Sequence, residues 1–150
     1  MTESVTAAIL KLMSVSPEDQ RIDQLQAEFL SNEFWGLSWA ASVQRVHIYR
    51  DGTSEGGRAE LSSKSKAYVR EKILPQYASL MSEAEHLKTI SRMKDTIESI
   101  GADVLSQGRY PYASAQKLLN LLLKYSWCVG TIPEPPHCPV DRIVVQKTRL

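Results

Sequence analysis

The sequence predicts an all-α fold, and four observations support this. Ser82 and Glu85 form a capping box, the pair that satisfies the first backbone N–H groups of a helix. The apolar residues that follow recur every three or four positions, as on one helical face: Leu87, Ile90, Met93, Ile97 and Ile100. Residues 113–129 are apolar almost all round, and residues 16–19 combine a capping Ser, a Pro and two acids. We therefore expect a compact bundle of five to seven helices.

The length of the chain and its apolar content predict one domain. A chain of 150 residues with 43% hydrophobic residues has the size and composition of a single domain with its own core. We expect the core to form around residues 113–129 as a buried central helix, with Gly130 as its C-terminal stop. The predicted domain covers residues 1–150.

The N-terminal third is expected to form three helical segments. Residues 5–13 are a short apolar helix candidate, and a second helix starts at Ser16. This second helix has one apolar face, formed by Ile22, Leu25 and Phe29. Asn32 is a candidate cap for a third helix over residues 33–49, although residues 46–49 also suit a short strand.

A flexible loop is predicted at about residues 51–58, where three glycines stand among polar residues. The loop lacks the Gly-Lys-Ser/Thr ending of a phosphate-binding loop. Residues 59–80 favour a helix that is kinked or ended near Pro75, because proline removes a backbone donor. His86 lies among glutamates in the first turn of the capped helix, so we interpret it as a surface histidine.

Charge and cysteine content restrict the class of protein. The formal net charge is +1, but residues 104–150 contain six basic and two acidic residues and carry +4, which leaves −3 for residues 1–103. A basic C-terminal segment fits an anionic partner. Two cysteines do not make a disulfide framework, and the N-terminus has no basic region of a secretory signal. We expect a cytoplasmic protein without a membrane partner, since the apolar run at 118–123 is too short to span a bilayer.

A narrow polar line runs along the predicted central helix. At 100° per residue, Lys117, Asn120 and Lys124 fall in one sector. Either this line is the only face of the helix that touches water, or it is the floor of a cleft that offers a lysine and an amide to a ligand. Beyond the proline-rich turn, Asp141 stands at a helix start, where it can cap the helix or face a lysine.

These residues carry a resemblance to a known family. Residues 113–142 resemble the catalytic segment of the helix–hairpin–helix DNA glycosylases, with a lysine in a helix followed by Pro139, Val140 and Asp141. The resemblance implies that Lys117 attacks the sugar carbon of a damaged nucleotide and that Asp141 supports the developing charge. Ser114 and Gln116 stand where the hairpin of the family has glycines.

Further candidate site residues follow from the same segment. Lys124 is the alternative catalytic lysine. Side chains that could contact a phosphate or another ligand are Arg109, Asn120, Lys124, His137 and Arg142. Cys128, His137 and Cys138 do not have the spacing of a zinc site, so no metal and no cofactor are expected. Cys128 is interpreted as a small buried residue.

Two functions remain open. The first is a non-enzymatic helical interaction module with a protein partner, which would bind at residues 34–39 or at the proline-rich turn. The second is a nucleic-acid-binding protein with degenerate or active glycosylase-like chemistry. Salt separates them, because phosphate binding weakens steeply as salt rises.

Overall fold

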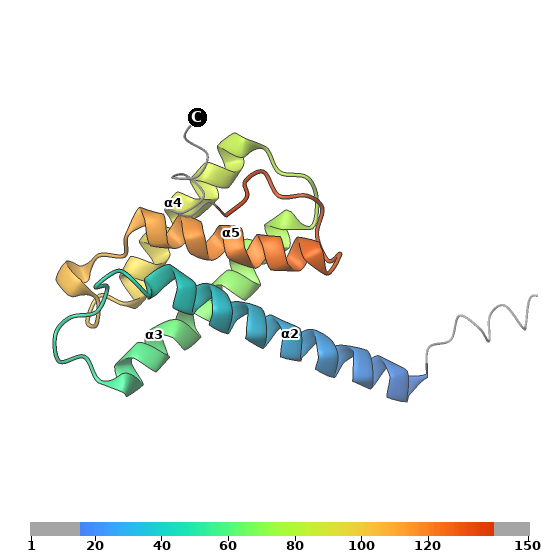
Figure 1. The fold of residues 1–150 in the computed structure, drawn as a ribbon, viewed down its shortest axis with the longest axis horizontal. Coiled ribbons are helices and arrows are strands. Elements are labelled where there is room, and N and C mark those ends of the chain that lie inside the picture. Colours follow the sequence, from blue (N-terminus) through green and yellow to red (C-terminus); the bar gives the residue numbers. More distant parts are fainter. Residues whose placement is uncertain (1–15, 140–150) are drawn as a thin grey trace, which may run out of the picture. The chain divides into compact units, whose positions relative to one another are not determined.

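The computed structural model describes residues 16–139, and these residues form an all-α structure (Figure 1). Its α-helices are α2 (Pro17–Val43), α3 (Glu55–Tyr68), α4 (Glu83–Ile100) and α5 (Tyr112–Cys128). The chain divides after Glu33 into two units, so residues 16–33 and residues 34–139 are described separately. The predicted helix at 5–13 and the candidate residues Asp141 and Arg142 lie outside the described residues.

Helix α2 begins as its sequence predicts. The Asp19 backbone N–H donates to Ser16 Oγ over 3.1 Å, and the Ser16 hydroxyl donates to Asp19 Oδ2 over 2.7 Å. Glu18 and Asp19 lie in the first turn, where the positive end of the helix dipole favours carboxylates. The Ser-Pro start is thus a working N-cap.

The predicted break of this helix at Asn32 is wrong. Helix α2 runs through Asn32 and Gly36 to Val43, and no separate helix extends to residue 49. Asn and Gly inside a helix cost only about 0.7–1 kcal/mol each relative to Ala. Burial of Trp35 and Trp39 on the later turns is worth more than that, so the helix continues.

An isolated antiparallel bridge joins Tyr49 to Leu105. Two further backbone bonds flank it: Arg50 N–H donates to Val104 O over 2.8 Å, and Ser106 N–H donates to Ile48 O over 2.8 Å. The extended alternative for residues 46–49 therefore describes this segment better than a helix does.

The predicted loop at 51–58 is shorter than expected. Ser54 caps α3 by accepting a hydrogen bond from the Gly57 N–H over 3.1 Å, so helix begins at Glu55 and includes two of the three glycines. Of the three glycines in this loop, only Gly52, at φ +81°, has the left-handed backbone of a turn glycine. The N-cap outweighed the low helix propensity of Gly56 and Gly57.

Helix α3 changes its winding before Pro75, as the sequence predicts. A π-turn covers Val69–Ile73 and a 3-10 turn covers Leu74–Tyr77. The Leu74 N–H donates to the Val69 carbonyl five residues back. Since proline has no N–H and its ring crowds the preceding turn, an α-helix cannot pass position 75 unchanged.

Helices α4 and α5 end at the two predicted glycines, by different means. Gly130 has φ +76°, and its N–H donates to Trp127 O over 2.9 Å while the Thr131 N–H donates to Ser126 O over 3.0 Å. This pair of bonds is the Schellman motif. Gly101 has φ −100°, which other residues also adopt. Glycine is required there because a side-chain Cβ would come too close to Leu61 and Leu105.

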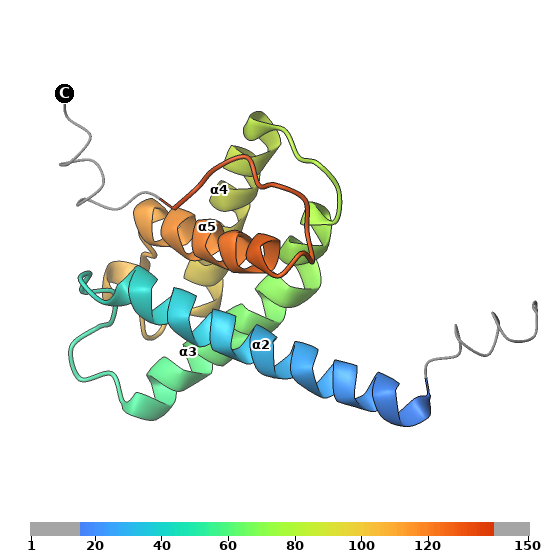
Figure 2. The same cartoon turned by 45° about the vertical axis from the view of Figure 1, so that its right-hand side comes forward.

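The core of residues 34–139 is formed by side chains from α2, α3, α4 and α5 and from the bridge. Helix α5 contributes Ala115, Leu118, Leu119, Leu122 and Leu123, and α4 contributes Ile90, Met93 and Ile97. Trp39 stacks between Trp35 and Tyr110, with ring centroids 5.4 and 6.1 Å away. Figure 2 shows α5 lying beside α4, with residues 129–139 running back past α5.

Gly101 gives a prediction with a matched control. A Cβ at this position would lie 2.8 Å from the Cδ1 atoms of Leu61 and Leu105, both buried in the core. We expect Gly101→Ala to lower the free energy of unfolding by about 1–3 kcal/mol through overpacking. Gly36, inside α2, has nothing within 4 Å of the added atom, so Gly36→Ala should raise it by up to about 1 kcal/mol. Urea unfolding followed by circular dichroism measures both, and equal effects would contradict the close approach at Gly101.

Candidate functional site

The predicted catalytic lysine, Lys117, and its alternative, Lys124, both lie on α5. Lys117 is half-buried, and Lys124 is exposed one to two turns later. Arg109, a candidate phosphate contact, is exposed just before α5. Asp141 and Arg142 are outside the described residues, so the pairing of Lys117 or Lys124 with Asp141 stays a prediction.

The polar line on α5 does not reach the surface at its middle position. Asn120 is only 4% exposed, and its side-chain oxygen lies 3.0 Å from His86 Nε2. Asn120 therefore offers its amide oxygen to a buried neighbour and not to a phosphate at the surface. The expectation of one continuous wet face, or of a cleft floor that includes this amide, is wrong.

His86 is the partner of Asn120, and the prediction of a surface histidine is also wrong. Its side chain is fully buried at the start of α4. Its Nδ1 lies 2.7 Å from the Tyr77 hydroxyl, and the ring of His137 meets it edge to face with centroids 4.7 Å apart. His137 in turn lies 3.1 Å from Glu83. Two predicted ligand residues, Asn120 and His137, thus meet at a histidine that was not predicted to join them.

The hydrogen bonds of His86 define which of its ring nitrogens carries the proton. An amide oxygen only accepts, so His86 Nε2 carries the proton and Nδ1 accepts from the Tyr77 hydroxyl. Burial is the main cause that lowers the pKa of His86, and the His137 charge adds to it, while Asn120 and Glu83 act the other way. Burial also raises the pKa of Tyr77. Both groups are therefore neutral near pH 7, and the network joins three segments of the chain.

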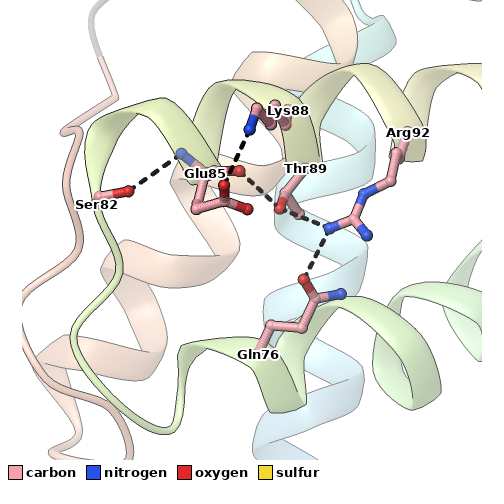
Figure 3. Close-up of polar contacts among 6 residues, drawn as sticks. All are labelled: Gln76, Ser82, Glu85, Lys88, Thr89 and Arg92. Carbon is pink, nitrogen blue, oxygen red and sulfur yellow. Dashed lines mark hydrogen bonds and ion pairs between the residues drawn. The ribbon is translucent and has the colours of Figure 1, made fainter.

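Polar side chains bridge the turn at residues 74–77 and α4 (Figure 3). Arg92 donates to Gln76 Oε1 over 2.9 Å and to Thr89 Oγ1 over 3.0 Å, and Thr89 donates to the Glu85 carbonyl. Gln76 precedes Tyr77, so these bonds hold the 3-10 turn against α4 beside the buried network. The arrangement supports Tyr77 and His86 in place and leaves both hydrogen-bonded within the protein.

A cleft beside α3 is lined by Glu60, Lys64 and Asp103, with Leu61 at its base. Glu60 and Lys64 form an ion pair of 2.7 Å, which lowers the pKa of Glu60. Both side chains are largely exposed, and pairs of this kind stabilise a helix only slightly. Glu60 and Lys64 neutralise each other in this cleft, and Asp103 leaves a formal charge of −1 among its lining residues, which include no Ser, Cys or His.

The predicted interaction surface at residues 34–39 belongs mostly to the core. Trp35 and Trp39 are 7% and 8% exposed, and Trp35 Nε1–H donates to Ser62 Oγ over 3.0 Å. Phe34 stacks on Tyr125 with centroids 5.2 Å apart. Packing across helices, which the sequence does not show, turned these aromatics inward.

Apolar side chains are instead exposed on the first part of α2. Within residues 17–33 no side chain is buried, and four large apolar ones are exposed. Leu30, at 37%, stands apart from the other three: Ile22 at 47%, Leu25 at 57% and Phe29 at 61%. At 100° per residue these three fall within a sector of about 60°. We call this row the α2 stripe. Exposed apolar rows with polar borders mark interaction sites on proteins.

Acidic residues surround the α2 stripe. Residues 16–33 contain five carboxylates and one guanidinium, a formal net charge of −4. Glu18 and Glu33 stand in line with the stripe near its two ends, and Asp19 and Glu28 lie about 60° to either side of it, with Arg21 about 40° from it on the Glu28 side. The candidate site therefore combines an apolar row with a negative border.

Comparisons with protein-family models, with curated proteins and with solved structures gave no match. The resemblance to the DNA glycosylases thus rests on the residues quoted for it. Within residues 16–139, no helix is long and apolar enough to cross a bilayer, and no three His, Cys, Asp or Glu side chains gather as metal ligands. Cys128, interpreted above as buried, is an exposed free thiol, as is Cys138.

Proposed function

We propose that this protein is a non-enzymatic helical interaction module that binds a protein partner through the α2 stripe. The observation that carries the proposal is the exposure of Ile22, Leu25 and Phe29 on a stretch of helix with no buried side chain. Helices in water gain most of their stability from packing an apolar face. A partner that covers the stripe supplies that packing.

The rest of the described chain fits a supporting role. Its polar network at His86 is saturated by internal hydrogen bonds, and its core side chains hold the helices together. The proposal keeps α5 as the centre of a bundle of five to seven helices over the whole chain. Two exposed free thiols, Cys128 and Cys138, fit the reducing conditions of the cytoplasm.

The test compares a variant that disrupts the α2 stripe with a control variant of the same net charge. Leu25→Glu with Phe29→Glu places two carboxylates in the stripe, and Gln24→Glu with Ala27→Glu places two on the other side of the same helix. Each protein is used to capture partners from cells of its own source, and the captured proteins are identified by mass spectrometry. We expect one set of partners to bind the wild type and the control and to be lost from the stripe variant. Identical sets for all three proteins would contradict the proposal.

The nucleic-acid alternative predicts a different result. Phosphate contacts by Arg109, Lys117 and Lys124 would give DNA binding that weakens steeply with salt and that Lys117→Ala reduces. Titration with short single- and double-stranded DNA measures this directly. Binding of that kind, unaffected by changes in the α2 stripe, would favour the alternative.

A further inference from the structure

The charge around the α2 stripe identifies the kind of partner. Building on the proposed function, we infer that the stripe binds an amphipathic helix whose apolar face is bordered by lysine or arginine. The stripe is narrow, straight and one helix face wide, which matches the face of a second helix. Its ligand is thus a basic helix of another protein.

The α2 stripe has the residue spacing of a helix-packing face. Ile22, Leu25 and Phe29 are spaced by three and four residues, the spacing at which side chains of two packed helices interdigitate. A helix laid along them would cover all three.

The residues that border the α2 stripe are mostly negatively charged. Glu18, Asp19, Glu28 and Glu33 border the row, so four carboxylates outnumber Arg21, the one basic residue within residues 16–33, which lies on the same border as Glu28. Positions that flank the contact of two packed helices set partner choice through charge. Basic flanks on the ligand would face these carboxylates, and acidic flanks would be repelled.

The same charge argues against other occupants. Two copies of this segment would bring two surfaces of net charge −4 together. A nucleic acid or an anionic membrane would meet the same repulsion. A basic amphipathic helix satisfies the apolar row and the carboxylates together.

The test compares two synthetic helical peptides of about 20 residues, with identical leucines spaced three and four apart. One has lysine at the flanking positions and the other has glutamate. Affinities for the whole protein are measured by calorimetry at low and moderate salt. We expect the lysine peptide to bind at least about tenfold more tightly at low salt, and the difference to shrink as salt rises.

Variants separate specific docking from general attraction of charge. Binding of the lysine peptide should be lost in Leu25→Glu with Phe29→Glu and retained in Gln24→Glu with Ala27→Glu. Equal affinities for the two peptides would overturn the inference, as would lysine-peptide binding that the stripe variant retains. Sedimentation that shows a dimer dissolved by the stripe variant would assign the stripe to a second copy. Binding of wild type to neutral vesicles, lost in that variant and without peptide binding, would assign it to a lipid surface.

The peptide experiment and the capture experiment can fail independently of each other. If partner capture depends on the stripe while the two peptides bind equally, the interaction module stands and the basic helix is wrong. If capture does not depend on the stripe, the proposed function itself fails. The peptide and capture experiments therefore report separately.

Discussion

Trp39→Ala is expected to lower the free energy of unfolding by about 3–5 kcal/mol, among the largest effects of any single substitution in residues 34–139. The indole is 8% exposed and stacks on the rings of Trp35 and Tyr110, with interplanar angles of 23° and 8°. Truncation leaves a cavity between two aromatic rings and removes both stacking contacts, each worth about 0.5–1.5 kcal/mol beyond area burial. Urea unfolding followed by circular dichroism at 222 nm gives the measurement without relying on tryptophan fluorescence.

Leu37→Ala is the matched control on the same helix. Leu37 is 54% exposed two residues before Trp39, so its truncation should change stability by no more than about 0.5 kcal/mol. A large gap between the two variants is the expected pattern. If Trp39→Ala cost as little as Leu37→Ala, Trp39 would be a surface residue, and residues 34–39 would again be the candidate docking surface.

His86→Ala is expected to cost a comparable amount, about 3–5 kcal/mol. The substitution removes two buried hydrogen bonds and leaves the Tyr77 hydroxyl and the Asn120 amide oxygen without this partner inside the protein. An unsatisfied buried polar group costs about 1–3 kcal/mol, and the lost ring adds a cavity. Leu87→Ala, at the next position and 38% exposed, should cost much less. Chemical unfolding at pH 7.5 measures both variants.

The pH dependence of stability tests the protonation state of His86. Its pKa in the folded protein is lowered from 6.5, mainly by burial, with His137 adding to the effect and Asn120 and Glu83 opposing it. Below pH 6.5 the unfolded chain takes up a proton at this position that the folded protein does not. The free energy of unfolding therefore falls as pH drops from 6.5 toward the folded pKa, by up to about 1.4 kcal/mol per pH unit from this group.

A comparison of slopes isolates this contribution. His86→Gln removes the titrating group and should flatten the fall in stability below pH 6.5, whatever its own stability at pH 7.5. Leu87→Ala is the control, because it changes the neighbouring position without removing a titrating group and should keep the wild-type slope. Parallel curves for wild type and His86→Gln would show that the buried histidine takes up its proton as readily in the folded chain as in the unfolded one.

Local chemistry made the ends of several helices predictable. The capping box at Ser82 and the stops at Gly101 and Gly130 locate α4 and α5 to within a residue or two, because capping acts between residues adjacent in sequence. The start at Ser16 is equally local. Breaks are harder to predict than caps: Asn32 looks like a cap but lies inside α2, since packing of the later turns decides whether a helix continues.

The face of α4 shows why the polar network could not be predicted with the same ease. Ile90, Met93 and Ile97 fit a row that starts at either His86 or Leu87, because both lie three or four residues before Ile90. Hydrophobicity favours Leu87, yet His86 is the buried one. The choice depends on Tyr77 and Asn120, which are distant in sequence and supply the hydrogen bonds that make a buried histidine tolerable.

The candidate site was only half visible in the sequence. The row of Ile22, Leu25 and Phe29 is evident from its spacing, and the sequence assigns it to one helical face. That this face is exposed while Trp35 and Trp39 are buried depends on which helices pack together. Aromatic content alone therefore pointed to the wrong part of α2.

The absence of buried side chains in residues 17–33 has a consequence for how this protein can change. Stability and function often conflict, because a functional site that needs flexibility or strain destabilises the fold that carries it. In the proposed function, recognition is encoded by positions 22, 25 and 29, and the core is encoded by other positions. Substitutions in the α2 stripe can retune partner choice while the core of residues 34–139 stays intact, so specificity is free to diverge faster than the fold.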